Sequence, residues 1–243
     1  MKIVVLAEFG GELSLEYIRE LLQSNIKVDS IVFIGDKYDT YRKQLVIERT
    51  KGRYTHLEFL DIIKGRTIKC YFVEEVNSQW CEMVLSMLGP DVVVSGCTKI
   101  IKRPVYNIPN YGMLNCHSGL IQKYRGCSCV EWAIYNDDIV GSSCHLIDKG
   151  IDTGSLVYQS ALKITENDSY SSVRAKMIKH QAVIMRKGVE SLLDNQTDFA
   201  RKVEKGDYYK PMRDDKLLER VISILEEKRY SHYNLPNSTD ISI

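Results

Sequence analysis

Three polar side chains near the middle of the chain could together carry an acyl group to a nitrogen atom. Asn115 and His117 lie two positions apart at the end of an apolar strand, so their side chains point to the same side. Asp152 lies in the turn-rich run DKGIDTG, whose glycines let the backbone bend tightly. The Asn115 amide and a protonated His117 can donate hydrogen bonds to the oxyanion that forms when an amine attacks a carbonyl carbon. The aspartate can orient the imidazole, raise its pKa and accept the proton of the amine.

On spacing alone, a purely structural role is the more common outcome for such residues. The surrounding elements must therefore bring the three side chains together. Strands are expected over residues 2–7, 28–34, 68–73, 91–95, 113–116, 142–147 and 155–162, and helices over 13–22, 41–49, 78–88, 128–135, 169–194 and 216–228. Gly89 and Pro90 form a stop signal for the third of these helices.

Alternation of strands and helices predicts an α/β fold, with a doubly wound, mostly parallel sheet covered by helices on both faces. We expect a catalytic domain over residues 1–195 and a short C-terminal extension over 196–243, with a polar tail that frays. In such sheets ligands bind beyond the carboxyl ends of the strands. This rule selects the segments that follow Val94 and Leu114.

Composition narrows the classes of partner. The 243 residues include 33 lysines and arginines against 32 aspartates and glutamates, a net charge of +1 that does not favour nucleic acid as a partner. No run approaches the roughly 20 apolar residues of a membrane span, and the start has too short an apolar run for a secretory signal. The seven cysteines are an odd number and are expected to be reduced, which favours a cytoplasmic protein.

Two sequence blocks resemble the folate-dependent formyltransferases, in that family's order and at about its spacing. The run NCHSGLIQKYRG is similar to the family's Asn-x-His signature, and GSSCHLIDKGIDTGSLVYQ is similar to its second block. The resemblance implies the Rossmann-like fold of that family and places the catalytic asparagine, histidine and aspartate on Asn115, His117 and Asp152. It leaves open whether His145 belongs to the site or is a packed, hydrogen-bonded histidine.

The same resemblance implies N10-formyltetrahydrofolate as the formyl donor. A looser match in VVVSGCTKII extends the likeness over residues 1–195. The backbone expected to hold the pteridine falls on two segments, formed by Thr98, Lys99, Ile100 and Ile101 and by Ile147, Asp148, Lys149, Gly150 and Ile151. Gln122, Cys97 and Ser143 depart from the family's usual proline, aromatic residue and threonine, which puts details of the pocket in doubt but not the chemistry.

Other residues are candidates for contact with the acceptor. Tyr124 and Arg125 directly follow the catalytic strand and could meet an anionic group, although a loop arginine is often only solvated. Gly10 and Gly11 sit where a phosphate-binding turn belongs, and a simple tight turn explains them equally well.

A metal site is not expected. Cys127 and Cys129 lie near His117 and His145 in sequence, together with Cys116 and Cys144, but the chain has no paired C-x2-4-C spacing of the kind structural zinc sites use. Cys116 and His117 are adjacent on a strand and therefore face opposite ways. Buried thiols are the expected state.

The acceptor is best matched by a nucleotide-linked amino sugar for surface polysaccharide. Methionyl-tRNA formyltransferases carry a further C-terminal domain, and glycinamide ribonucleotide formyltransferases carry a phosphate loop that is missing here, while the formyltetrahydrofolate hydrolases usually begin with a regulatory domain. The GDYYKPM run is similar to a stretch that sugar N-formyltransferases carry near their dimer contact, which implies a homodimer. Methionyl-tRNA and glycinamide ribonucleotide stay open as alternative acceptors. A non-catalytic subunit that binds folate or a nucleotide sugar also stays open, although the intact trio argues against it.

Overall fold

A seven-stranded sheet organises the computed structural model, which describes residues 1–24, 26–35, 40–194, 201–202 and 204–235. Its strands, in spatial order, are β3 (Lys69–Val73), β2 (Ser30–Ile34), β1 (Ile3–Glu8), β4 (Val92–Ser95), β5 (Gly112–His117), β7 (Gly141–Leu146) and β8 (Leu156–Ala161). The first five are parallel, and β7 runs antiparallel to both of its neighbours. The predicted doubly wound, mostly parallel sheet is confirmed.

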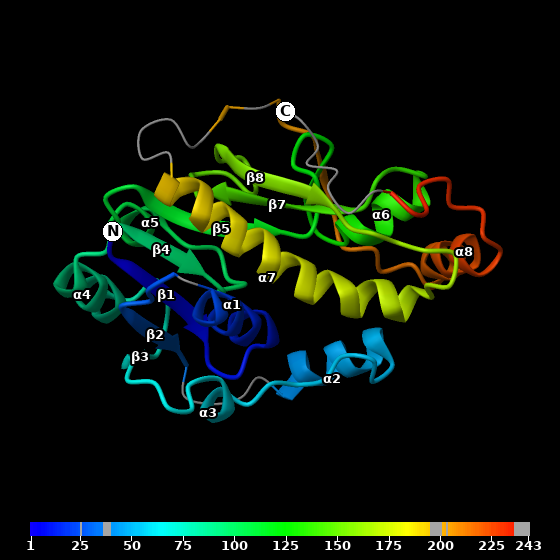
Figure 1. Ribbon diagram of the computed structural model, residues 1–243. Coiled ribbons are helices and arrows are strands. Elements are labelled where there is room, and N and C mark those ends of the chain that lie inside the picture. Colours follow the sequence, from blue (N-terminus) through cyan, green and yellow to red (C-terminus); the bar gives the residue numbers. More distant parts are fainter. Residues whose placement is uncertain (25, 36–39, 195–200, 203, 236–243) are drawn as a thin grey trace.

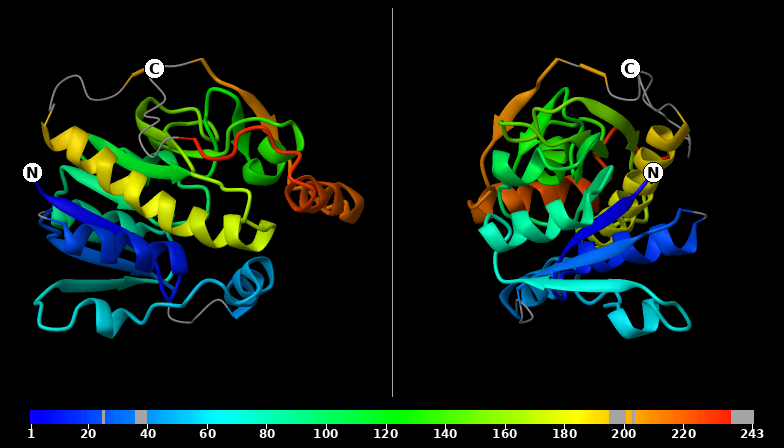
Figure 2. Two further views of the ribbon diagram at one scale, coloured as in Figure 1. Left: turned by 45° about the vertical axis from the view of Figure 1, so that its right-hand side comes forward. Right: turned by 90° about the vertical axis from the view of Figure 1, so that its left-hand side faces the viewer.

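Helices cover both faces of this sheet (Figures 1 and 2). The long helix α7 (Tyr170–Asp194) and α1 (Glu12–Gln23) pack on one face, and α4 (Gln79–Leu88) and α5 (Arg103–Tyr106) lie on the other. In β1, Val5 contributes to the core under α1 and α7, whereas Val4 contributes to the core under α4. This alternation follows from the two-residue period of a strand that is buried on both faces.

Local signals in the sequence set the ends of α4. The Ser78 hydroxyl caps its start by accepting a hydrogen bond from the backbone N–H of Cys81. Gly89 ends it in the left-handed conformation, with φ of 54°, where the predicted stop signal lies.

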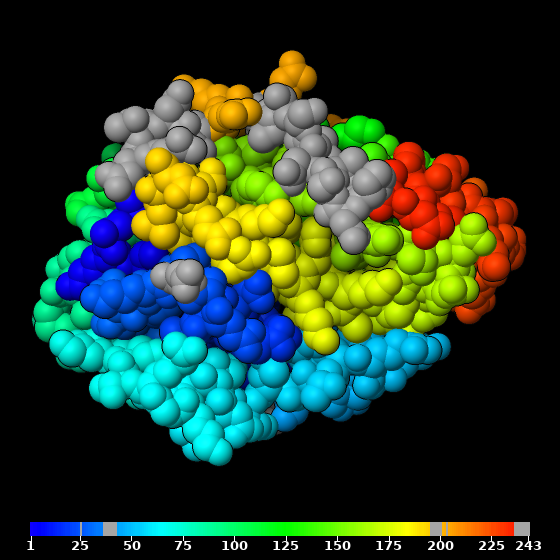
Figure 3. Space-filling model, viewed as in Figure 1, coloured from blue at the N-terminus to red at the C-terminus, as the bar shows by residue number. Residues whose placement is uncertain are grey.

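The segment between β2 and β3 runs along the outside of α1 and α7 (Figure 3). It contains α2 (Thr40–Thr50) and the short α3 (Phe59–Ile62). Arg53 Nε donates a hydrogen bond of 3.2 Å to Ser171 Oγ at the start of α7, which fixes the end of α2 against that helix.

The C-terminal segment packs against the part of the chain that follows β5. Helix α8 (Asp215–Glu226) packs against α6 (Cys129–Tyr135) in a third apolar core, to which α7 contributes Val173 and Met177. Strand β9 (Asp207–Tyr209) pairs in parallel with β6 (Tyr124–Gly126). The predicted domain boundary at 195/196 and the end of the predicted frayed tail, 236–243, lie outside the described residues.

None of the helices within the described ranges combines the length and the apolar character that crossing a bilayer requires.

Candidate active site

The end of β5 places Asn115 and His117 on one side of the sheet and Cys116 on the other. Cys116 packs into the core beneath α7, as the predicted alternation requires. Its backbone carbonyl accepts a hydrogen bond of 2.7 Å from Gln181 Nε2 on α7 and a contact of 3.4 Å from the Tyr17 hydroxyl on α1. Two helices on the far face therefore anchor the peptide that connects Asn115 and His117.

The neighbouring strand β7 brings His145 into the site. The antiparallel register sets His145 opposite Asn115, and Asn115 Nδ2 lies 3.3 Å from His145 Nε2. His145 Nδ1 lies 2.9 Å from the carbonyl oxygen of Leu146, to which it donates. His145 Nε2 is thereby held against the amide of Asn115, so His145 fixes the position of that amide.

Asp152 closes the set from the loop after β7. Its Oδ2 lies 3.4 Å from His117 Nδ1, and its Oδ1 lies 3.5 Å from His145 Nε2. The backbone N–H of Gly126, in β6, donates a hydrogen bond of 2.9 Å to Asp152 Oδ2. Asp152 itself has φ of 50°, a left-handed conformation that is uncommon outside glycine and tolerated best by Asp and Asn. The structure thus brings the three predicted catalytic residues together.

Burial and hydrogen bonding set the charges of the site. Burial by itself would raise the pKa of Asp152, but the hydrogen bond from His145, the charges of the two histidines and the Gly126 N–H lower it to about 2. The carboxylate is therefore ionised at neutral pH.

The pKa of His117 is lowered, because burial outweighs the opposing attraction of Asp152. Asp152 does raise the pKa of this imidazole, as expected, but burial outweighs it, so the expectation of a protonated His117 is wrong. The ring has only 8% of its surface exposed, and desolvation penalises its charged form more than the carboxylate favours it. His117 is thus neutral at neutral pH and donates through one N–H.

The two segments expected to hold a pteridine follow β4 and β7, the strands that flank β5 on its two sides. Thr98 follows β4, where its backbone N–H and hydroxyl donate to Glu8 Oε1 over 2.9 and 2.6 Å. Ile101 and Ile147 belong to the same apolar cluster. Ile100 is 72% exposed and Ile151 is 42% exposed, so each segment presents an apolar side chain outward. The apolar side chains of such segments can pack against the face of an aromatic ring, and their backbone amides can bind polar atoms at its edge.

The candidate acceptor residues have separate environments. Tyr124 is 2% exposed, and its hydroxyl donates over 2.7 Å to Asp138 Oδ2, which gives the side chain a place in the core. Arg125 donates from Nε to the carbonyl of Gly206 over 2.6 Å and from Nη1 to that of Ile151 over 3.3 Å. It therefore joins the C-terminal segment to the Asp152 loop.

Gly10 and Gly11 follow β1, two strands away from β5. Gly10 has φ of 72°, and Gly11 caps the start of α1 with its backbone N–H donating to the Glu8 carbonyl over 3.0 Å. Glu8 Oε1 also accepts the hydrogen bonds of Thr98, so the turn after β1 and the segment after β4 meet at the carboxyl ends of these two strands. The strand order of the sheet reverses between β1 and β4, so this meeting point is at the topological switch point.

None of the seven cysteines, all of which lie within the described residues, is in a disulfide. Cys129 Sγ lies 3.2 Å from His117 Nε2, and Cys127, two residues earlier, is exposed. Over the described part of the chain, no group of three or more histidine, cysteine or acidic side chains is arranged to hold a metal ion.

Three features of the site were not predicted from the sequence: the contact of Cys129, the Gly126 N–H on Asp152, and the membership of His145, which stayed open. The register of β5 against β7 assigns His145 to the site. The sequence signal for His145 was its spacing of two residues from Ser143. Ser143 lies opposite His117 in this register, so His145 faces the same side of the sheet as Asn115 and His117.

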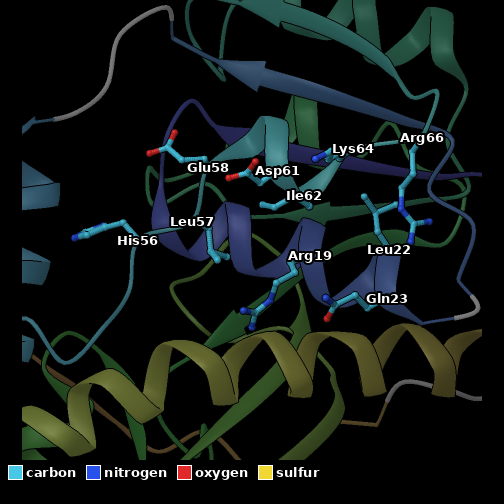
Figure 4. Close-up of a pocket in the computed structure, with 10 residues that line it drawn as sticks. All are labelled: Arg19, Leu22, Gln23, His56, Leu57, Glu58, Asp61, Ile62, Lys64 and Arg66. Atoms are coloured by element: carbon cyan, nitrogen blue, oxygen red, sulfur yellow. The ribbon is translucent and has the colours of Figure 1, made fainter.

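A pocket of about 380 Å3 lies between α1 and residues 56–66 (Figure 4). Its lining residues are Arg19, Leu22, Gln23, His56, Leu57, Glu58, Asp61, Ile62, Lys64 and Arg66. Asn115, His117 and Asp152 are not part of this lining. A second pocket, of about 390 Å3, is lined by Lys123, Tyr124, Gly206 and their neighbours, beside the loop that follows β5.

Comparison with known proteins identifies the family. The sequence model of the family described as formyl transferase matches residues 1–188. Among curated relatives, the bifunctional polymyxin resistance protein ArnA of Wigglesworthia glossinidia brevipalpis is 31% identical over 57% of this chain and 22% of its own length. A methionyl-tRNA formyltransferase of Clostridium tetani is 27% identical over 55% of this chain and 44% of its own length. The aligned region thus covers less than half of either relative.

Solved structures share the fold. A sugar N-formyltransferase of a Shewanella species has a TM-score of 0.61 at 19% identity, covering 90% of this chain and 80% of that one. Glycinamide ribonucleotide transformylase 1 of Symbiobacterium toebii has a TM-score of 0.61 at 18% identity, covering 85% and 94%. An N-formyltransferase of Helicobacter canadensis, solved with folinic acid and dTDP-3-aminofucose, has a TM-score of 0.57 at 18% identity, covering 88% and 72%.

Proposed function

The chain belongs to the formyl transferase family, and from this premise we propose that it transfers a formyl group from N10-formyltetrahydrofolate to a primary amine. The observation that carries the proposal is the closed polar set of Asn115, His117 and Asp152, with His145 linking the amide to the carboxylate. These groups lie at the end of β5, beside the edge where the strand order reverses.

Each residue of the trio has a distinct part in this reaction. The nitrogen of the amine attacks the formyl carbon, and the carbonyl oxygen gains negative charge. The Asn115 amide and the N–H of neutral His117 on its Asp152 side donate to that oxygen. Asp152, ionised at neutral pH, receives the proton that the amine loses, directly or through water. The bond between the formyl carbon and N10 of the folate then breaks, and a proton returns to N10.

The donor would be held by the two segments after β4 and β7. The backbone of Thr98, Lys99, Ile100 and Ile101 and that of Ile147, Asp148, Lys149, Gly150 and Ile151 would bind the pteridine. The outward Ile100 and Ile151 side chains support this placement, because an aromatic ring binds well against apolar groups. The folate supplies the activated formyl group, and the protein supplies position, hydrogen bonds and a proton acceptor.

We propose a deoxy-amino sugar linked to a nucleoside diphosphate as the acceptor, for surface polysaccharide. The near-neutral charge of the chain and its GDYYKPM run support this choice over tRNA. The Helicobacter canadensis protein was solved with a nucleotide-linked amino sugar. Arg125, Gly10 and Gly11 remain candidates for the phosphates and Tyr124 for an acceptor contact. The curated relatives include methionyl-tRNA formyltransferases, so methionyl-tRNA is the second candidate.

A panel of acceptors tests the proposal. Release of tetrahydrofolate from N10-formyltetrahydrofolate is followed with nucleotide-linked amino sugars, with glycinamide ribonucleotide and with methionyl-tRNA, for the wild type and Asn115→Ala. We expect turnover with an amino sugar and a fall of about 100- to 1000-fold in the variant, because one oxyanion donor is lost. If both proteins are equally inert with every acceptor while folate binds, the chain is a binding protein and not an enzyme.

We further propose that the protein is a cytoplasmic homodimer. Seven cysteines without a disulfide among the described residues support a reducing compartment. The GDYYKPM run supports the dimer by resemblance alone, and in one chain its Asp207–Tyr209 part already pairs with β6. Sedimentation at several protein concentrations gives the mass in solution.

A further inference from the structure

Cys129 lies against the side of the His117 ring that faces away from Asp152. Its Sγ is 3.2 Å from His117 Nε2, and only 1% of the residue is exposed. Gly119 closes this contact from the other side, because a Cβ there would lie 2.7 Å from His117 Nε2 and 2.9 Å from Cys129 Cβ. The thiol and this edge of the imidazole are therefore held together without room for water between them.

Proton counting decides the direction of this contact. Asp152 is ionised and can only accept, so the neutral ring is most stable with its proton on Nδ1, the nitrogen that faces Asp152. Nε2 then carries a lone pair. The thiol can donate to this lone pair, whereas the reverse arrangement would set the lone pair of Nδ1 against a carboxylate.

The surroundings of Cys129 favour the protonated form of its thiol. Burial, together with the nearby carboxylates of Asp152 and Glu131, raises the pKa of Cys129 despite the opposing charge of Arg174. Around His117 the remaining groups are His145, whose charge disfavours the imidazolium, and the Tyr124 carbonyl, which favours it. That carbonyl lies on the Nε2 side, near the point where a Cβ of Gly119 would stand, and it competes with the thiol by attracting a proton to Nε2. The thiol has one other acceptor, the carbonyl of Cys127, at the longer distance of 3.8 Å.

We propose that Cys129 is a positioning residue whose S–H donates to Nε2 of His117 and holds the ring proton on Nδ1. Resting on the proposed function, this makes His117 a hydrogen-bond donor on the side where Asp152 and the substrates meet. The His117 Nδ1 to Asp152 distance of 3.4 Å is long for a hydrogen bond, so the same N–H can turn to the oxygen of the formyl group.

The first test needs no substrate. Nitrogen-15 NMR of the wild-type protein labelled in its five histidines distinguishes the two neutral tautomers, and His117→Gln assigns the signal of His117. We expect Nδ1 protonated and Nε2 unprotonated at neutral pH. A proton on Nε2 would overturn the proposal, whether or not the chain transfers formyl groups.

Variants of Cys129 then separate the hydrogen bond from packing. Cys129→Ser keeps a donor and should keep the tautomer, whereas Cys129→Ala removes the donor and should mix the tautomers. Without the donor the neutral ring is less favoured, so the titration midpoint of His117 should rise by about half a pH unit in Cys129→Ala. Cys81→Ala, which removes a fully buried thiol on α4, is the matched control and should leave His117 unchanged.

Activity supplies the last readout. With the best acceptor, the acidic limb of the kcat/KM profile should move with the NMR midpoint, and kcat should fall about 2- to 5-fold in Cys129→Ala but not in Cys129→Ser. Unchanged tautomer and midpoint in Cys129→Ala would overturn the proposal. A shifted tautomer in a protein that transfers no formyl group would leave the positioning role standing and reject the proposed function.

Discussion

The Asp152 carboxylate accepts a hydrogen bond from the backbone N–H of Gly126 and faces the imidazoles of His117 and His145. It therefore interacts with most of the polar groups of the site. Its left-handed backbone and the nearby Gly154 show how tightly the loop turns: a Cβ at Gly154 would lie 1.6 Å from the carbonyl oxygen of Leu146. The loop therefore has little freedom to move the carboxylate. This rigidity keeps the proton acceptor at a fixed distance from His117.

Replacing His117 separates chemistry from donor binding. His117→Asn removes the imidazole donor beside Asp152, and we expect kcat to fall by about 100-fold or more, because a positioned proton donor or oxyanion donor contributes that much. The folate contacts are proposed to come from backbone, so the Kd for a folate analogue should change less than about 3-fold. Calorimetry with the analogue measures this, and loss of folate binding in the variant would contradict the prediction.

Asp152 gives a pH-dependent term in stability. Its folded pKa of about 2 lies below the ordinary value of 3.8, so its stabilising effect is present above pH 4 and is lost as the pH falls toward 2. We expect the free energy of unfolding of the wild type, relative to Asp152→Asn, to decrease by about 2 kcal/mol across this window. Asparagine tolerates the left-handed backbone, so the substitution removes mainly charge.

Denaturant unfolding at pH values between 2 and 5 provides the measurement, with Asp61→Asn on the exposed side of α3 as the control. A wild-type advantage that stayed constant over this range would show that Asp152 is not held ionised by its neighbours. His117 acts in the same direction at higher pH: its folded pKa is lowered, so protonation of the unfolded chain reduces stability as the pH falls below its ordinary value.

Between elements, the pairing of β6 with β9 connects the C-terminal segment to the Asp152 carboxylate. Gly126 donates its N–H to Asp152 and has φ of 95°, and a Cβ at this position would lie 2.4 Å from the carbonyl oxygen of Tyr209. Strand β9 therefore lies as close to β6 as a glycine allows. The position of the amide that binds Asp152 depends on a strand more than 80 residues away in sequence.

Gly126→Ala should therefore damage both stability and activity. We expect a loss of about 2 to 3 kcal/mol in the free energy of unfolding, from backbone strain and from the clash with β9, and a fall in kcat because the amide moves away from Asp152. Gly52→Ala is the matched control: Gly52 also has a positive φ, 71°, but nothing lies within 4 Å of a Cβ there.

Thermal unfolding and steady-state kinetics of Gly126→Ala and Gly52→Ala distinguish the cost of backbone strain from the effect of moving the Gly126 amide away from Asp152. The control should lose about 1 kcal/mol and keep its kcat. Equal losses in the two variants would show that β9 does not constrain β6.

The elements that could be predicted from the sequence are those whose signals are local. Val92–Ser95 is a β-branched run, Gly89 and Pro90 mark a helix end, and the long helix of residues 170–194 carries a sustained periodic pattern. Strands β6 and β9 were missed because each spans three residues and exists only through its partner. The helices α3 and α5, with four residues each, are too short for a periodic pattern.

Within the site, the predictable part was the trio, and the unpredictable part was what surrounds it. Asn115 and His117 share a face because they are two residues apart, which the sequence shows directly. The contact of Cys129 depends on how α6 docks over β5, and the lowered pKa of His117 depends on how much water that docking excludes. Neither is a property of nearby sequence.

For the protein taken together, the C-terminal segment is part of the main structure. Val221 and Leu225 of α8 are fully or almost fully buried against α6 and α7, in the same core as Tyr124 and Cys129. A core shared in this way predicts that the extension does not unfold separately from the active-site region.

Leu225→Ala tests this coupling. We expect a loss of about 2 to 5 kcal/mol, the usual cost of a cavity at a fully buried leucine, and a single calorimetric transition that moves to lower temperature. Leu60→Ala, at a residue that is 76% exposed, should leave the transition almost unchanged. An early, separate transition in Leu225→Ala would show instead that residues after 201 form an independent unit.

The pairing of β9 with β6 also sets an order of events during translation. Ribosomes make the chain from its N-terminus, so Asn115, His117 and Asp152 leave the exit tunnel long before residues 207–209. Until those residues emerge, β6 lacks the strand that places the Gly126 amide, and Asp152 lacks the clamp that depends on it. A nascent chain therefore carries Asn115, His117 and Asp152 before strands β6 and β9 can pair and hold Asp152 in place.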